Sequence, residues 1–121
     1  MLPRDDYSMS NQIVVVGSAN IDLIAKAPRL PRPGETILGG KFTTAPGGKG
    51  ANQAVSAARL GAEVWFVGCI GEDDFANELL VAFKSAGIHK KFLRQDINTP
   101  TGVGLICVDE AGENTIIVSS G

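Results

Sequence analysis

A lysine stands among three glycines at Gly47-Gly48-Lys49-Gly50, where the pattern of residues predicts that a loop turns into a helix. Residues without a Cβ atom let another molecule approach the backbone closely, and the free N–H groups of a helix start favour oxygen-rich or anionic groups. Lys49 and Asn52 add side-chain donors at the same place. A tight loop with a solvated lysine would have the same residues, but the combination favours a site for a small polar ligand.

A second polar cluster, Asn20 and Asp22, comes directly after an apolar run over residues 13–17. In sheets built from parallel strands, ligands bind beyond the carboxyl ends of the strands. Two side chains spaced i and i+2 in an extended chain point to one side. Asp22 offers only acceptors and Asn20 offers both donors and acceptors, which suits recognition of adjacent hydroxyls. A turn asparagine beside a solvated aspartate is the alternative for this pair taken alone.

The glycine loop matches neither of two common phosphate-binding patterns. A P-loop needs glycine six residues before the lysine and serine or threonine after it, and these positions hold Thr43 and Gly50. The dinucleotide pattern GxGxxG fails because Ser18 and Ala19 follow Gly17. The two polar clusters together therefore predict a site for a sugar or another polyol.

The elements that must position these residues alternate between strand and helix. Residues 13–17 and 63–70 read as buried strands, and residues 50–60 and about 75–86 read as helices with small or apolar stripes. This order predicts an α/β fold with a parallel sheet and right-handed crossovers. Residues 1–12 read as an N-terminal extension, which leaves residues 13–121 as the domain.

Further strands are predicted outside that alternating pattern. They cover residues 21–26, 36–45, 102–108 and 114–119, and the last two form a hairpin around a polar turn. Proline and glycine punctuate the chain between the first two of them. Because a parallel sheet of two or three strands is thin and its edge is exposed, the chain is interpreted as part of a larger fold.

The overall composition excludes several classes of function. The 121 residues carry a net charge of −2 and are 44% hydrophobic, as in an ordinary soluble domain. This charge gives no reason to expect nucleic acid or a membrane surface as a partner, and no apolar run is long enough to cross a bilayer. Cys69 and Cys107 each lie in an apolar run, which predicts buried thiols in a reducing cytoplasm rather than a disulfide or a metal site.

The remaining polar residues give weaker signals. His89 follows a helix end and is interpreted as a surface residue, and Asp73 and Asp74 are interpreted as helix-capping residues rather than paired acids. No residue has the surroundings of a general base beside a nucleophile.

Taken together, these motifs resemble the N-terminal part of the ribokinase-like carbohydrate kinase family over about residues 12–121. The matching segments are Val16-Gly17-Ser18-Ala19-Asn20-Ile21-Asp22, Pro33-Gly34-Glu35-Thr36, Gly47-Gly48-Lys49-Gly50-Ala51-Asn52-Gln53-Ala54, Gly71-Glu72-Asp73, Thr101-Gly102-Val103 and Gly112-Glu113-Asn114.

The resemblance implies a fold, a reaction and a set of site residues. The fold would be a ribokinase-like parallel central sheet flanked by helices and covered by a small β-sheet lid, of which this chain holds only the N-terminal part. The reaction would transfer the γ-phosphate of ATP to the 5-hydroxyl of D-ribose, with Mg²⁺ and an activating monovalent cation (K⁺), in a cytoplasmic homodimer joined through the lid strands. By the same resemblance, the residues that contact the sugar would be Asn20, Asp22, Gly47, Gly48, Lys49 and Asn52.

The resemblance also implies what these 121 residues lack. The family's catalytic aspartate lies in a Gly-Ala-Gly-Asp segment of the C-terminal half, and this sequence does not contain that segment. No catalytic, ATP-binding or metal-binding residue is therefore expected here, and the 121 residues alone are expected to be inactive. The alternatives are a kinase for a related pentose such as deoxyribose, a non-catalytic sugar-binding or dimerisation module, and a nucleotide-binding glycine loop.

Overall fold

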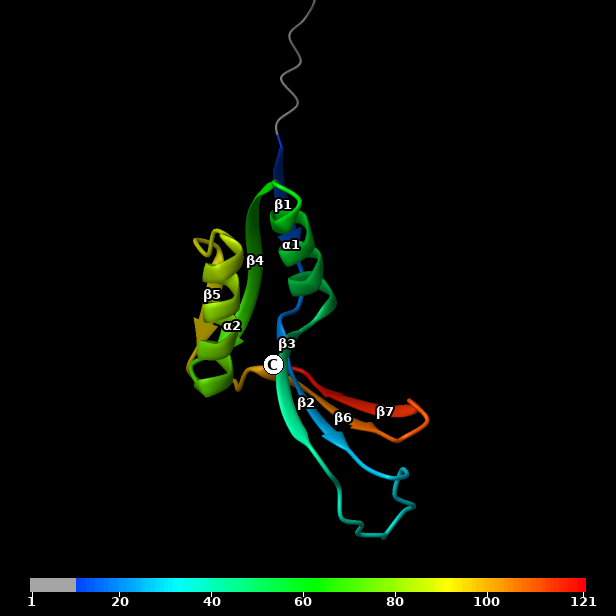
Figure 1. Cartoon of the computed structure of the whole chain (residues 1–121). Coiled ribbons are helices and arrows are strands. Elements are labelled where there is room, and N and C mark those ends of the chain that lie inside the picture. The colour runs from blue at the N-terminus through cyan, green and yellow to red at the C-terminus, as the bar shows by residue number, and fades with distance from the viewer. Residues whose placement is uncertain (1–10) are drawn as a thin grey trace, which may run out of the picture.

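The computed structural model describes residues 11–121. They form two helices and two β-sheets, and the sheets meet near the C-terminus (Figure 1). The predicted extension over residues 1–12 lies outside the described residues up to residue 10, and Gln12 already belongs to the first strand. The elements in chain order are β1 (Gln12–Val16), β2 (Asn20–Lys26), β3 (Phe42–Gly47), α1 (Lys49–Arg59), β4 (Glu63–Gly71), α2 (Asp74–Ala86), β5 (Leu93–Asp96), β6 (Gly102–Val108) and β7 (Asn114–Ser119).

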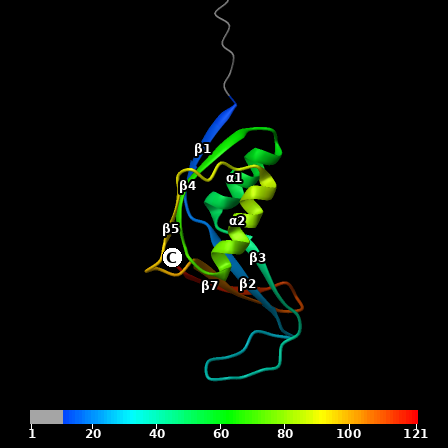
Figure 2. The ribbon, with the colours of Figure 1, turned by 90° about the vertical axis from the view of Figure 1, so that its left-hand side faces the viewer.

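The first sheet is parallel and has the strand order β1-β4-β5. Both helices lie on the same face of this sheet, as the side view in Figure 2 shows. The predicted parallel α/β arrangement is therefore confirmed. The sequence did not predict β5, because its residues, Leu93 to Asp96, are mostly polar and form no apolar run.

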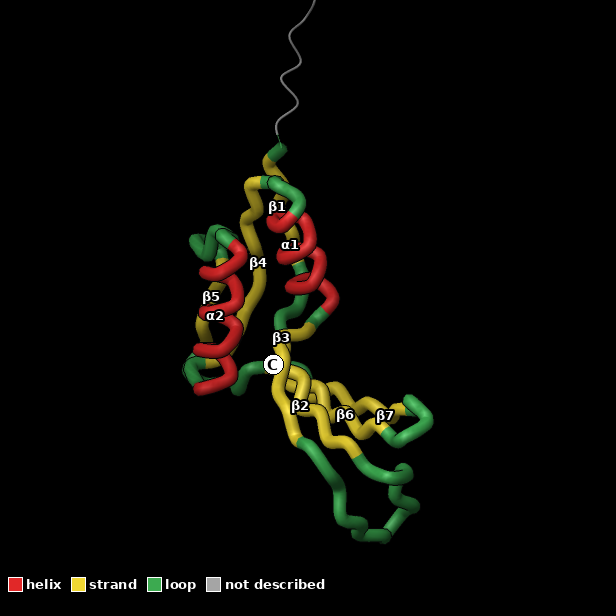
Figure 3. Tube along the Cα trace, in the orientation of Figure 1, coloured by secondary structure: helices red, strands yellow, loops and turns green. Residues whose placement is uncertain are grey.

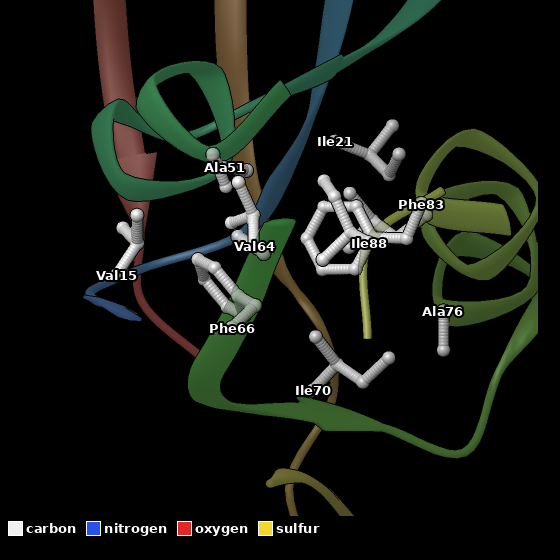
Figure 4. Packing of buried hydrophobic residues seen from close by; sticks show 12 residues of the cluster. Val15, Ile21, Ala51, Val64, Phe66, Ile70, Ala76, Phe83 and Ile88 are labelled. Carbon is white, nitrogen blue, oxygen red and sulfur yellow. The ribbon is translucent and has the colours of Figure 1, made fainter. Parts of the chain in front are cut away.

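The hydrophobic core lies between the first sheet and the two helices (Figure 4). Phe66 of β4 packs against Phe83 of α2 with ring centroids 5.0 Å apart and a tilt of 59°, a geometry that aromatic pairs favour. Ala51 and Ala54 form the small buried stripe of α1, which lets this helix pack closely. Ile21 of β2 is fully buried in the same core. The core therefore also anchors the start of the second sheet.

The start of α2 and the C-terminal ends of both helices agree with the sequence prediction. Asp73 caps α2, because its carboxylate accepts a hydrogen bond of 2.8 Å from the backbone N–H of Ala76. Gly87 follows α2 and Gly61 follows the last turn of α1, each with a positive φ.

The opposite face of the first sheet has no helix over it in residues 11–121. In β1, Val14 is 61% exposed and Val16 is 75% exposed on this face. The prediction that residues 13–17 form a buried strand was therefore wrong for this face. Cys69 is exposed and Cys107 is only partly buried. The prediction of buried thiols was also wrong, because an apolar run in a strand supplies residues to both faces and only one face is covered.

The second sheet has the strand order β3-β2-β6-β7 and projects away from the helices (Figure 3). Strand β2 pairs antiparallel with β3 and parallel with β6, and β7 forms a hairpin with β6. The predicted strand over residues 36–45 was wrong in its first half, since β3 begins only at Phe42. The backbone N–H of Gly40 instead donates to the Lys26 carbonyl at 2.7 Å, which turns the chain into a loop.

An ion pair organises the loop between β2 and β3. The Arg29 guanidinium donates two hydrogen bonds, of 2.5 and 2.9 Å, to the carboxylate of Glu35, and the backbone N–H of Arg32 donates a third at 3.0 Å. These hydrogen bonds and the nearby positive charge lower the pKa of Glu35 to about 2.

We expect Glu35 to titrate near pH 2 in the folded protein, below its ordinary pKa of 4.5. Because the folded pKa is depressed, the pair stabilises the fold above pH 4.5 and this contribution is lost as the pH falls through about 2. An NMR titration of the Glu35 carboxyl measures the value, and the Arg29→Met variant should return it to the ordinary range. A wild-type midpoint equal to that of the variant would contradict this interpretation.

Candidate functional site

The glycine loop packs against the connection between β1 and β2. Gly48 has a φ of +92°, and a Cβ atom there would lie 2.6 Å from the Ser18 carbonyl oxygen. The same oxygen accepts a hydrogen bond of 3.1 Å from the backbone N–H of Ala51, in the first turn of α1. Only glycine satisfies both the backbone conformation and the space at position 48. The loop and the end of β1 are therefore held together by backbone contacts.

Two further glycines, Gly17 and Gly50, bring the start of α1 close to the end of β1. A Cβ atom on Gly50 would lie 2.9 Å from the Cα of Gly17. The first turn of α1 therefore rests directly on the carboxyl end of β1. Lys49, the first residue of α1, lies between the two closely packed glycines Gly48 and Gly50, and its side chain is exposed.

The carboxylate of Asp22 occupies space that two glycines leave open. A Cβ atom would lie 2.5 Å from its Oδ2 if added to Gly47 of β3, and 2.7 Å from its Oδ1 if added to Gly104 of β6. No described residue donates a hydrogen bond to this partly buried carboxylate, and burial raises its pKa. A partly buried carboxylate with unused acceptors is suited to bind donors of a ligand.

Asn20 lies beside Asp22 on the same strand and has similar surroundings. It pairs with Gly47 of β3 on one side and with Gly102 of β6 on the other. Its side-chain oxygen lies over Gly102, in the place that a Cβ atom would occupy. The register of three strands thus brings together Asn20, Asp22 and the first glycine of the loop.

A cavity of about 410 Å³ opens at the carboxyl ends of β1 and β4 and includes Asn20. Its other lining residues are Gly17, Ser18, Ala19, Cys69, Gly102, Val118, Ser120 and Gly121. Asn52 instead lines a separate groove between α1 and α2, together with Arg59. The structure therefore places Asn20, Asp22, Gly47 and Gly48 next to one another, and Asn52 lines the groove between the helices.

Sequence reasoning did not identify Gly102 and Gly104 as part of the site. The signal was available, since a glycine inside a strand often marks close approach by another group. Two such glycines, spaced i and i+2 in β6, lie on the same face and lie beneath Asn20 and Asp22.

Residues 11–121 bring no three His, Cys, Asp or Glu side chains together in a way that could hold a metal ion. Within this part of the chain, neither helix has the length and apolar composition that a bilayer crossing requires.

The family model for the pfkB family carbohydrate kinases matches residues 10–121. The chain belongs to the pfkB family of carbohydrate kinases. The resemblance that the sequence motifs indicate is therefore confirmed. Ribokinase of Bacillus subtilis (strain 168) is 43% identical over 109 residues, which cover 90% of this chain and 37% of that enzyme. Ribokinase of Mus musculus is also 43% identical, over 90% of this chain and 34% of that enzyme.

Solved structures give the same result for the fold of this pfkB-family chain. Arabidopsis thaliana ribokinase, solved as a complex with ribose and ATP, superimposes with a TM-score of 0.82 at 40% identity, over 92% of this chain and 36% of that one. Ribokinase from Thermotoga maritima gives a TM-score of 0.81 at 40% identity, over 88% and 35%. The chain spans about a third of the length of these relatives.

Proposed function

We propose that these residues form the sugar-binding part of a ribokinase-type kinase, which transfers the γ-phosphate of ATP to the 5-hydroxyl of D-ribose. The observation that carries the proposal is the unpaired carboxylate of Asp22, which two glycines accommodate beside the glycine loop. The similarity to an enzyme solved with ribose and ATP supports this choice of substrates.

In the proposed site, the sugar lies between the start of β2 and the start of α1. Asp22 accepts hydrogen bonds from adjacent hydroxyls, and Asn20 both donates and accepts. Gly47 and Gly48 let the sugar approach the backbone, and Lys49 donates to a sugar oxygen. Asn52, three residues after Lys49 in α1, donates through its side-chain amide.

The donor side of the reaction is assigned to the rest of the protein. When bound, ATP would supply the phosphoryl group, Mg²⁺ would neutralise part of the phosphate charge, and a monovalent cation such as K⁺ would activate the enzyme. In-line transfer needs donor, metal and base positioned together, and no described residue is assigned to any of these. The 121 residues alone are therefore proposed to bind sugar without catalysing transfer.

The second sheet is proposed to act as a lid over the sugar in a cytoplasmic enzyme. Lid closure excludes water, so that ATP reacts with the sugar hydroxyl and not with solvent. Strand β7 lies at the edge of this sheet and exposes Ile116, Ile117 and Val118. An exposed apolar edge strand can pair with a second copy. We therefore propose a homodimer through the lid, which light scattering of the full-length protein tests.

A sugar panel with the full-length protein tests the proposed reaction. ATP-dependent ADP release is expected with D-ribose, and 2-deoxyribose is the competing substrate. Calorimetry with each sugar separates binding from transfer. Ribose binding without ADP release would support a non-catalytic module instead. A thermal shift with ATP but with no sugar would support the nucleotide-binding alternative.

A further inference from the structure

Thr101 combines deep burial with polar bonding to two other elements. It is 3% exposed and is the buried polar residue of the described chain. Its hydroxyl accepts a hydrogen bond of 2.9 Å from the backbone N–H of Gly71, at the end of β4. The same hydroxyl donates a hydrogen bond of 2.7 Å to Asp73, the residue that caps α2.

Asp73 uses both of its carboxylate oxygens at this junction. Its Oδ1 accepts from the Thr101 hydroxyl and from the backbone N–H of Ala76 at 2.8 Å, and its Oδ2 accepts from the backbone N–H of Thr101 at 2.9 Å. Burial raises the pKa of Asp73, but the hydrogen bonds from Thr101 and Ala76 together lower it below its ordinary value. The carboxylate is therefore held ionised between the helix and the second sheet. We call this set of bonds the Asp73–Thr101 latch.

The atoms of the Asp73–Thr101 latch are tightly packed around Gly71. A Cβ atom on Gly71 would lie 2.6 Å from the backbone nitrogen of Thr101 and 2.9 Å from Oδ2 of Asp73. The end of β4, the start of α2 and the start of β6 thus meet at one point. Since buried hydrogen bonds are costly to leave unmade, this junction has one favoured arrangement.

The position of the latch connects it to the candidate site. Thr101 directly precedes Gly102, which pairs with Asn20, and Gly104 pairs with Asp22 two residues later. These two glycines supply the surface on which the Asn20 and Asp22 side chains lie. A shift of β6 along or away from β2 would therefore change the space under both polar side chains.

A second contact joins the same two parts of the molecule in a different way. The hydroxyl of Thr44 in β3 donates to the carboxylate of Glu78 in α2 at 3.0 Å, and this pair is exposed. Water competes for an exposed hydrogen bond, so this bond does little to fix the position of β3 relative to α2. Thr44 therefore offers a matched control. It is also a threonine that joins the second sheet to α2, but it is exposed.

We propose that Asp73 and Thr101 are positioning residues for sugar binding, because they hold β6 so that Gly102 and Gly104 stay beneath Asn20 and Asp22. The inference rests on the proposed function and deepens it. It predicts that disrupting the latch weakens the binding of sugar and leaves the binding of ATP unchanged.

The test compares Thr101→Val, Thr101→Ser and Thr44→Val in the full-length protein. Thr101→Val removes the hydroxyl and leaves the buried N–H of Gly71 without its acceptor, so KM for ribose and the calorimetric Kd should rise by about tenfold. KM for ATP should stay within about twofold, as should all constants of Thr101→Ser and Thr44→Val. Hydrogen exchange of the backbone amides of residues 102–108 should accelerate only in Thr101→Val.

Two results would overturn the proposal. One is an unchanged ribose Kd and unchanged exchange of residues 102–108 in Thr101→Val. The other is an equal loss toward ribose and ATP together with a lower Tm, which is the signature of general destabilisation. If Thr101→Val does not fold, Asp73→Asn, which keeps one carbonyl acceptor and the helix cap, is measured by the same criteria. If the wild-type protein binds no pentose, the proposed function fails, and the exchange of β6 in the same variants decides whether the latch positions that strand.

Discussion

Replacing Asp22 by alanine is expected to weaken ribose binding by the full-length protein by about 100-fold or more. The carboxylate has no hydrogen-bond donor within residues 11–121, so both of its oxygens are available to sugar hydroxyls. Each charge-assisted hydrogen bond contributes about 1.5–3 kcal/mol, and two are lost together. Calorimetric titration with ribose measures the change, and Asp22→Asn should show an intermediate loss because it keeps one acceptor.

A matched control separates this effect from a general change in charge. Glu110 is an exposed carboxylate in the turn between β6 and β7 of the same sheet, and Glu110→Ala should bind ribose as the wild type does. Ribose affinity should also fall as the pH is lowered through the pKa of Asp22, which burial raises above its ordinary value. An Asp22→Ala protein with wild-type ribose affinity would remove the basis of the proposed site.

The local parts of the site could be predicted from the sequence because their signals lie within a few residues. The glycine loop, the Asn20–Asp22 spacing and the Asp73 cap each depend on neighbouring residues, and the structure bears out the cap and the start of α1. The C-terminal ends of the helices likewise follow from a nearby glycine, Gly87 directly after α2 and Gly61 two residues after α1.

The parts that were missed depend on residues far apart in the chain. Gly104 lies beneath Asp22 only because β2 and β6 pair in one particular register, and no local pattern specifies this register. Cys69 was predicted to be buried because sequence alone does not show which face of a strand is covered.

Replacing Gly48 by alanine is expected to lower the free energy of unfolding by about 2–4 kcal/mol and to abolish measurable ribose binding. A Cβ atom at this position adds two penalties. The φ of +92° is strained for any residue with a side chain, and the added carbon would lie 2.6 Å from the Ser18 carbonyl oxygen. Because that oxygen also accepts the hydrogen bond from the N–H of Ala51, the clash separates α1 from the end of β1.

Gly61 isolates the first of these penalties. Its φ is +96°, close to that of Gly48, but no atom lies within 4 Å of the place where its Cβ would stand. Gly61→Ala should therefore show only the backbone strain, about 1 kcal/mol, and should bind ribose normally. Denaturant unfolding and calorimetry of the two variants measure both quantities side by side. Equal destabilisation with intact ribose binding in both would mean that close contact between the loop and β1 is not what builds the site.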